Sequence, residues 1–172
     1  MRSGLLLLLL VSHFAFSQHV PTFEEVISLR NITGVTVSPN GKSVAYTIQA
    51  TDWVENRFDT EIWLWRQGSE PFQLTNNPRG NSMAPRFSPD GKWISFLSDR
   101  GNKNQVYLMR IDGGEPRAVT REEEGVSFYE WHPAGGQIVF VKPEKESKTK
   151  KDREKRYGAF EADDKEFTRS HL

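Results

Sequence analysis

Short apolar runs, each preceded by a tight turn, recur along this chain. In the clearest copy, the turn Phe87-Ser88-Pro89-Asp90-Gly91-Lys92 leads into Trp93-Ile94-Ser95-Phe96-Leu97. Pro89 presets φ for the turn, and Gly91 can adopt the positive φ that closes it. The run that follows is rich in β-branched and aromatic residues, with apolar side chains on both faces. This pattern predicts a strand that is buried between packed layers.

The same unit occurs three times. The other two copies begin at the turns Ser38-Pro39-Asn40-Gly41-Lys42 and His132-Pro133-Ala134-Gly135-Gly136. Pro39, Pro89 and Pro133 are 50 and 44 residues apart. A second repeat lies out of phase with the first, because the segment 61–75 matches the segment 105–120. Two interleaved repeats of this length, with several strands in each copy, are typical of propeller blades.

We therefore expect an all-β fold: an incomplete β-propeller of about two and a half four-stranded blades, after a signal peptide and one short helix. The expected blades are blade 1 at 34–75, blade 2 at 84–120 and a partial blade 3 at 126–172. The strands expected in blade 1 are 34–37, 43–50, 61–66 and 72–75. Those of blade 2 are 84–87, 92–98, 105–111 and 117–120. Blade 3 would begin with 127–131 and 137–141, followed by a charged insertion at 142–167 and a new strand near Thr168.

The N-terminal residues 1–17 have the pattern of a secretory signal peptide. Arg2 is followed by an apolar run from Leu5 to Val11, which is too short to span a bilayer, and Ala15-Phe16-Ser17 offers a cleavage site. We expect an exported protein, periplasmic or extracellular and bacterial, with no membrane span after cleavage. Residues 18–33 would form a helical segment in which Thr22 is the N-cap and Glu25 completes a capping box.

Composition narrows the possible partners. The 172 residues include 23 Lys and Arg against 23 Asp and Glu, so no overall field favours nucleic acid or an anionic membrane. The chain has no cysteine, which excludes disulfides, Cys-ligated zinc and a thiol nucleophile within it. Nothing in the sequence indicates a cofactor.

The turns and the segments that flank them resemble a known type of repeat. Ser-Pro-Asp-Gly-Lys, Ser98-Asp99-Arg100-Gly101 and Asp112-Gly113-Gly114-Glu115-Pro116 are similar to TolB-type propeller repeats. Such repeats occur in TolB and in serine peptidases of the prolyl-oligopeptidase family. Glu55-Asn56-Arg57 and the charged insertion resemble the acylaminoacyl-peptidase and dipeptidyl-peptidase branch. TolB would be expected to place a separate α/β domain before the first blade, and the segment between Gln18 and Gly34 is too short for one.

This resemblance implies a non-catalytic propeller portion of an exported serine exopeptidase that acts on short peptides. The propeller would gate access to a C-terminal α/β-hydrolase domain with a Ser-Asp-His triad, and none of those catalytic residues lies in this chain. An uncovered blade face would cost much of a domain's stability, so we expect the chain to begin a longer protein. The alternative is a TolB-like periplasmic propeller that acts as a protein-binding scaffold. The sequence leaves the oligomeric state open.

Few residues have the pattern of a catalytic or metal site. The segment Gly80-Asn81-Ser82-Met83-Ala84 is close to a nucleophile elbow, but a strand follows it where a helix is required, so we interpret it as a loop between blades. His13, His19, His132 and His171 have no metal-ligand spacing. The segment 99–104 lacks the pattern of a calcium loop and is expected to be a hairpin loop.

The charged insertion offers the remaining candidates. Its basic run 142–156 contains acidic residues and no interleaved aromatics, so we interpret it as a solvated excursion and not as a nucleic-acid site. By the resemblance, an insertion can help recognise the free amine of a substrate, and acidic side chains suit that role. The candidates are Glu161, Asp163 and Asp164. Asn31-Ile32-Thr33 fits a glycosylation acceptor and is assumed to be unmodified.

Overall fold

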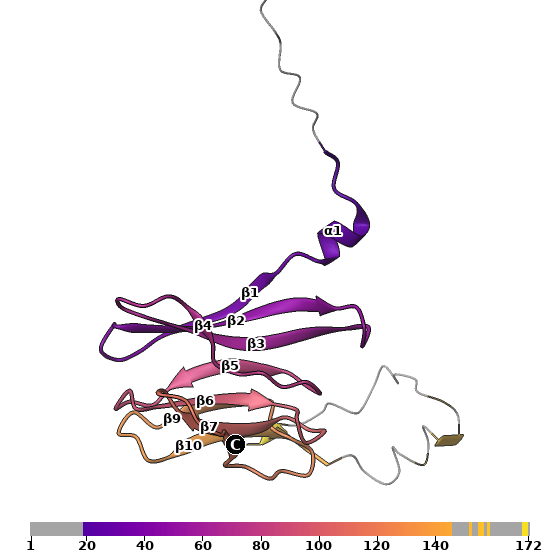
Figure 1. The fold of residues 1–172 in the computed structure, drawn as a ribbon. Coiled ribbons are helices and arrows are strands. Elements are labelled where there is room, and N and C mark those ends of the chain that lie inside the picture. The colour runs from indigo at the N-terminus through magenta and orange to yellow at the C-terminus, as the bar shows by residue number, and fades with distance from the viewer. Residues whose placement is uncertain (1–18, 146–151, 153–154, 157, 159–169, 172) are drawn as a thin grey trace, which may run out of the picture.

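The computed structural model describes residues 19–145, 152, 155–156, 158 and 170–171. These residues form antiparallel sheets that are stacked face on face (Figure 1). The arrangement confirms the expected all-β fold of partial propeller blades.

Blade 1 and blade 2 are four-stranded sheets in which the strands are ordered as they occur along the chain. Blade 1 contains β1 (Asn31–Val37), β2 (Ser43–Asp52), β3 (Arg57–Arg66) and β4 (Phe72–Gln73). Blade 2 contains β5 (Ser82–Phe87), β6 (Trp93–Ser98), β7 (Gln105–Arg110) and β8 (Arg117–Ala118). All eight strands overlap the ranges that the repeats predict. β1, however, begins at Asn31, inside the segment 18–33 that the sequence predicts to be helical, and α1 covers only Phe23–Ile27 of that segment.

Some strand bounds differ from the prediction. The β2–β3 hairpin is longer than expected. Its pairing continues without a register shift from Gln49–Thr60 to Asp52–Arg57, the last pair of the hairpin. The outer strands β4 and β8 are shorter than expected. Backbone hydrogen bonds continue past each of them. Leu74 N and Thr75 N donate to Ile62 O at 2.7 Å and 3.2 Å, and Val119 N donates to Val106 O at 2.8 Å.

Blade 3 has three strands in the described residues. β9 (Phe128–Trp131) and β10 (Ile138–Pro143) form a hairpin, and β11 (Ser170–His171) pairs with the end of β10 through Lys142 and Pro143. A strand therefore begins close to Thr168, as expected. β10 runs two residues into the predicted insertion, and most of the insertion lies outside the described residues.

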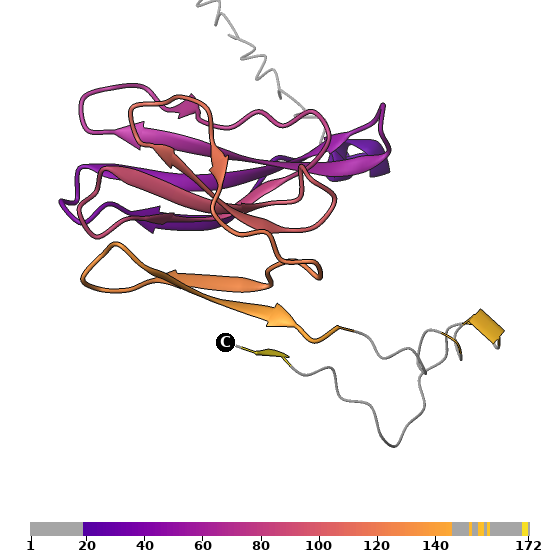
Figure 2. The same ribbon diagram turned by 90° about the horizontal axis from the view of Figure 1, so that it is seen from below.

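The three Pro-Gly turns lie at one edge of the stack, which we name the turn edge (Figure 2). Gly41, Gly91 and Gly135 all have positive φ, at 69°, 68° and 75°. The turns nest against one another: a Cβ placed on Gly91 would lie 3.7 Å from Pro39 Cδ, and one on Gly135 would lie 4.0 Å from Pro89. The β2–β3 and β6–β7 turns and the segments between blades lie at the opposite edge, the loop edge.

Helix α1 (Phe23–Ile27) confirms the predicted capping box. Glu25 N donates to Thr22 Oγ1 at 3.2 Å, and Thr22 N donates to Glu25 Oε2 at 2.8 Å. None of its residues is buried, so the helix is held by polar contacts to blade 1. Thr51 Oγ1 donates to Ile27 O at 2.5 Å, and Trp53 Nε1 donates to Ser28 Oγ at 3.3 Å.

Two hydrophobic clusters join the blades. The first packs Ala45, Ile62 and Leu64 of blade 1 against blade 2, and the second packs Leu97 and Val106 of blade 2 against blade 3. β6 is buried on both faces, as its apolar pattern predicts. No helix in the described part of the chain is long and apolar enough to cross a membrane.

Candidate functional site

The structure does not test the acidic candidates. Glu161, Asp163 and Asp164 lie outside the described residues, so their role in recognising an amine stays a prediction. The same is true of the signal peptide at residues 1–17.

The segment resembling a nucleophile elbow is structural. Ser82 has no exposed surface and forms the first residue of β5, so its hydroxyl is not available to a substrate. Gly80 and Asn81 precede it in the connection between blades 1 and 2.

The described histidines have local contacts. His132 lies in the third turn, where its backbone N donates to Gln137 O at 2.9 Å and its Nδ1 accepts from Ala134 N at 3.2 Å. His19 Nε2 lies 2.8 Å from Glu25 Oε2. The described ranges contain no group of three or more His, Cys, Asp or Glu residues able to hold a metal ion.

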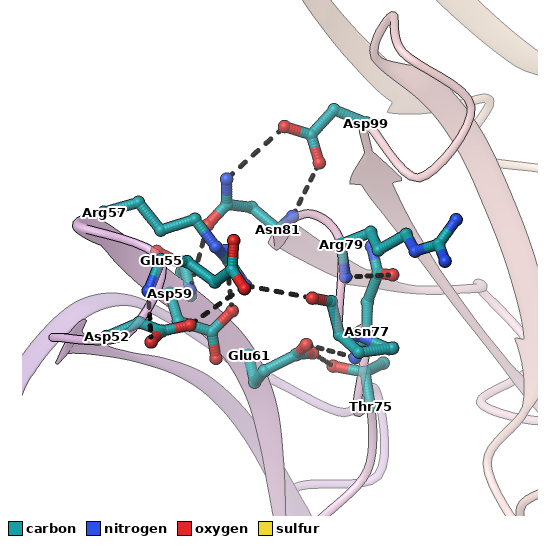
Figure 3. A network of polar contacts seen from close by, with 12 residues as sticks. Asp52, Glu55, Arg57, Asp59, Glu61, Thr75, Asn77, Arg79, Asn81 and Asp99 are labelled. Carbon is teal, nitrogen blue, oxygen red and sulfur yellow. Dashed lines mark hydrogen bonds and ion pairs between the residues drawn. The ribbon is translucent and has the colours of Figure 1, made fainter.

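Polar side chains instead gather at the loop edge, where the β2–β3 hairpin meets the connection to blade 2 (Figure 3). We name this group the linker network. It contains Asp52, Arg57, Asp59, Glu61, Thr75, Asn77, Asn81 and Asp99.

Arg57 organises the hairpin side of the linker network. Its Nη1 lies 3.0 Å from Asp59 Oδ1, and its Nη2 lies 3.6 Å from Asp52 Oδ2. Nη2 also donates to Pro78 O at 3.4 Å, in the connection to blade 2. One guanidinium thus joins two acidic side chains of blade 1 to the segment that leaves the blade. The Arg57 side chain is only 26% exposed, which favours a persistent contact.

Glu61 is the buried centre of the linker network. It is 4% exposed, and its carboxylate accepts from Asn77 N at 2.5 Å and from Thr75 Oγ1. Thr75 Oγ1 in turn accepts from Ile62 N at 2.9 Å. Burial raises the pKa of Glu61, and the nearby Asp59 charge adds to this, while the hydrogen bonds from Thr75 and Asn77 oppose it.

Blade 2 repeats this arrangement with an amide in place of the carboxylate. Gln105 Oε1 accepts from Thr120 Oγ1 at 2.8 Å and from Glu122 N at 3.0 Å. Val106 N donates to Thr120 Oγ1 at 2.9 Å. The Gln105 amide also donates from Nε2 to Glu122 O at 2.8 Å, which a carboxylate cannot do. Each blade therefore fastens the segment that follows its outer strand to its third strand.

Asn81 joins the two blades. Its Oδ1 accepts from Thr60 N of blade 1 at 3.0 Å, and its backbone N donates to Asp99 Oδ1 of blade 2 at 2.6 Å. A Cβ on Gly80 would lie 2.3 Å from the same Asp99 oxygen, so this close approach requires glycine. Asp99 begins the β6–β7 loop, which is the hairpin loop that the sequence predicts.

A pocket of about 330 Å³ lies next to the linker network, where the loop edge passes from blade 2 to blade 3. It is lined by Asp99, Asn102, Lys103, Asn104, Glu124, Gly125, Val126, Ser127 and Pro143. Its volume falls within the range of small-molecule sites, but its lining is mixed in charge and contains no aromatic side chain.

The loop edge can therefore position chain segments and offer polar contacts. Within the described residues it does not combine a nucleophile with a general base. Sequence reasoning missed Glu61, Asn81 and Asp99. The sequence did contain a signal for Glu61. The repeat aligns Glu61 with Gln105 and Thr75 with Thr120, and a polar pair that occurs at the same two positions of each repeat indicates two side chains that bond to each other.

Comparison with known proteins identifies the same type of propeller. A family model described as TolB beta propeller domain matches residues 20–159. The uncharacterized peptidase YuxL of Bacillus subtilis is 31% identical over 138 residues, which are 78% of this chain and 20% of that protein. Dipeptidyl-peptidase 5 of Porphyromonas endodontalis is 31% identical over 133 residues, which are 77% of this chain and 19% of that protein. The chain spans about a fifth of the length of these curated relatives.

Solved structures show the same fold. A putative TolB from Agrobacterium tumefaciens is 30% identical, with a TM-score of 0.51 over 66% of this chain and 38% of that one. An acylaminoacyl peptidase from Pyrococcus horikoshii has a TM-score of 0.59 over 70% of this chain and 18% of that one. Its 17% identity supports the fold alone. The resemblance to TolB-type repeats and to this branch of peptidases is confirmed.

Proposed function

We propose a function on the premise that this chain belongs to the TolB beta propeller domain family. It is a propeller domain homologous to the N-terminal portions of peptidases and to TolB. In our proposal it is the non-catalytic propeller of an exported serine exopeptidase. The propeller limits access of substrates to a hydrolase domain carried by the same, longer protein, and the substrates are short peptides.

The observation that carries the proposal is the match to peptidases over more than three quarters of this chain. The 31% identity to Dipeptidyl-peptidase 5 extends over 77% of this chain but only 19% of that relative. In a longer peptidase of this kind, the polypeptide outside the propeller carries the catalytic residues. The described residues agree with a non-catalytic role, because their polar groups at the loop edge bond to one another and fix the connections between blades.

The test uses the full-length protein that the gene encodes. Chromogenic dipeptides and acylated amino acids are offered as substrates, with and without a serine-reactive phosphonate. We expect turnover of short substrates that the phosphonate abolishes, and no cleavage of a folded protein. Absence of turnover on every short substrate would overturn the proposal. Fractionation of the cells tests export separately, with the protein expected outside the cytoplasm.

A second candidate function is a periplasmic scaffold that binds other proteins. It is favoured by the 30% identity to the putative TolB structure, which is close to the identity with the named peptidases. The two functions differ in the remainder of the gene. A hydrolase nucleophile motif downstream of the propeller supports the peptidase, and further blades followed by a stop support the scaffold.

A further inference from the structure

The first Pro-Gly turn contains a dipeptide that is chemically unstable. Asn40-Gly41 is the only Asn-Gly pair in the sequence. Asparagine is a thermolabile residue, and it is lost most rapidly before glycine, because a residue without a Cβ leaves its backbone N unhindered for attack on the side chain. The other asparagines precede bulkier residues, such as the β-branched Ile32 after Asn31. The sequence therefore places a preferred site of deamidation in this turn.

The reaction is an intramolecular substitution at the side-chain carbonyl. Base removes the proton of Gly41 N, and this nitrogen attacks Cγ of Asn40. The new N–Cγ bond closes a succinimide ring, the bond from Cγ to Nδ2 breaks, and the amide leaves as ammonia. Water then opens the ring. Cleavage of the N–Cγ bond gives aspartate, whereas cleavage of the bond from N to the main-chain carbonyl carbon gives isoaspartate. Water is consumed and ammonia is released, and no oxidant takes part.

The folded turn opposes the first step. Gly41 N donates to Ser38 O at 2.9 Å, so its proton is engaged in the bond that closes the turn. Asn40 Oδ1 accepts from Ser38 Oγ at 2.8 Å and from Lys42 N at 3.0 Å, which holds the carboxamide in one orientation. Ser38 Oγ also accepts from Ser43 N at 2.9 Å. Removal of the Gly41 proton therefore waits for the turn to open, as amide hydrogen exchange does.

The site is otherwise open to solvent. Asn40 is exposed, and a Cβ placed on Gly41 would meet no atom within 4 Å. Base and water therefore reach both reacting atoms as soon as the bond to Ser38 O breaks. The barrier that the fold adds is the opening of the turn and not the burial of the site.

The two products differ in how they fit the turn. Aspartate can keep the bonds of Asn40, because Asp90 accepts from Ser88 Oγ and from Lys92 N at the same positions of the second turn. Isoaspartate adds a carbon atom to the main chain. The first turn has no room for a longer path, since its proline lies 3.7 Å from the Cβ position of Gly91.

We propose that Asn40 is a deamidation site that the folded turn keeps closed. Opening of the turn converts it to aspartate, which the turn accepts, or to isoaspartate, which the turn rejects. The inference is independent of the proposed function, because the reaction needs neither a hydrolase domain nor a substrate.

Ageing of the full-length protein in mildly alkaline buffer tests the proposal, with one sample folded and one in guanidinium chloride. Trypsin releases the peptide 31–42, and fragmentation in a mass spectrometer locates the deamidated residue. Asn31, in the same peptide, is the internal control and should react far more slowly than Asn40. We expect Asn40 to deamidate at least about tenfold faster in the unfolded sample, because the open fraction of the turn scales the folded rate.

Two serine variants test the role of the turn. Ser38→Ala removes the bonds of its hydroxyl in the first turn, and the matched control Ser88→Ala removes the equivalent bonds in the second. In the folded state we expect Asn40 to deamidate about fivefold faster in Ser38→Ala than in the parent, the factor for one typical hydrogen bond. Ser88→Ala should leave the rate unchanged. After removal of denaturant, the refolded fraction of the aged parent should contain aspartate and be depleted of isoaspartate.

Equal rates in the folded and unfolded samples would overturn the proposal. So would an Asn31 that reacts as fast as Asn40 in denaturant, equal rates in the two serine variants, or isoaspartate that refolds as readily as aspartate. If Ser38→Ala does not fold, hydrogen exchange of the Gly41 amide in the parent replaces that comparison. Its protection should match that of Asn40, and an unprotected Gly41 amide would overturn the proposal.

Discussion

The backbone N of Asn81 and the carboxylate of Asp99 are 2.6 Å apart, and this contact anchors the entry of the chain into blade 2. The same asparagine accepts a hydrogen bond from Thr60 N of blade 1 at 3.0 Å. One residue between the blades therefore bonds to both of them, to blade 1 through its side chain and to blade 2 through its backbone.

Replacing this side chain should loosen the junction. Asn81→Ala leaves Thr60 N without its acceptor, so we expect the free energy of unfolding to fall by about 1–3 kcal/mol. Urea denaturation monitored by tryptophan fluorescence measures the change. Asn76→Ala, at an exposed neighbouring position, is the matched control and should alter stability by less than about 0.5 kcal/mol. Equal losses in the two variants would contradict this role of Asn81.

The buried carboxylate of Glu61 should make stability depend on pH. Burial raises its pKa above the ordinary value of 4.5 in the folded protein, so the folded state holds the proton more tightly than the unfolded state. The resulting stability is fully present below pH 4.5 and is lost as pH rises through the raised pKa. Glu61→Gln reproduces the blade 2 arrangement and should remove this slope, with stability near neutral pH within about 1 kcal/mol of the parent or above it.

Denaturation of both proteins over a pH series provides the measurement. Glu61→Ala is the control for the hydrogen bonds themselves, because it leaves Asn77 N unpaired. It should cost about 1–3 kcal/mol at every pH. If the free energy of unfolding changed with pH in the same way in the parent protein and in the Glu61→Gln variant, Glu61 would not titrate as inferred.

Tyr129 should link blade 3 to the inner strand of blade 2. Its hydroxyl donates to Ala84 O at 2.8 Å, and the residue is 2% exposed. Tyr129→Phe leaves this carbonyl without its donor and should cost about 1–2 kcal/mol, measured by denaturation. Tyr46→Phe is the control, since the hydroxyl of this half-buried tyrosine makes no hydrogen bond within the part of the chain that the structure describes, and it should cost less than about 0.5 kcal/mol.

The same tyrosine gives an alkaline signature. Burial raises the pKa of Tyr129 far above its ordinary value of 10.0. Its contribution to stability is therefore fully present below pH 10.0 and is lost as pH rises beyond it. Ultraviolet titration of the folded protein should show one tyrosine that ionises only on unfolding, and the Tyr129→Phe variant should lack it. An unchanged titration curve in that variant would contradict the assignment.

The first turn should accept aspartate in place of asparagine. Asn40 Oδ1 accepts from Ser38 Oγ at 2.8 Å and from Lys42 N at 3.0 Å, and Asp90 accepts from Ser88 Oγ and Lys92 N in the same way. We expect Asn40→Asp to be as stable as the parent at neutral pH, and Asn40→Ala to lose about 1 kcal/mol. Thermal unfolding compares the three proteins. A loss in Asn40→Asp as large as in Asn40→Ala would show that these bonds are not what holds the turn.

The fold was predictable because several independent signals coincide at each strand. Pro89 and Gly91 mark a turn, the apolar run after them marks a buried strand, and the repeat places both a second and a third time. The strand ends were less predictable. Arg57 and Asp59 are charged, which in sequence indicates the end of a strand. In the structure Arg57 pairs with both Asp59 and Asp52, and the β2–β3 hairpin continues beyond the apolar core.

The site was less predictable for a physical reason. Asp99 looks like an ordinary loop residue, and only the stacking of blades brings it to Asn81. Glu61 carries no local sign of burial, since charged residues are seldom buried without a partner. Its partner lies 14 residues away and is found only through the match between Glu61-Thr75 and Gln105-Thr120.

Because Pro39 nests against Gly91 and Pro89 against Gly135, residues inserted into one of these three Pro-Gly turns would disturb the turn beside it. At the opposite edge, the connections within blades differ in length, at 53–56, 99–104 and 144–169. Insertions should therefore be accommodated in the hairpin loops of this opposite rim and not in the nested Pro-Gly turns. Grafted peptides should be tolerated on that rim and rejected on the other.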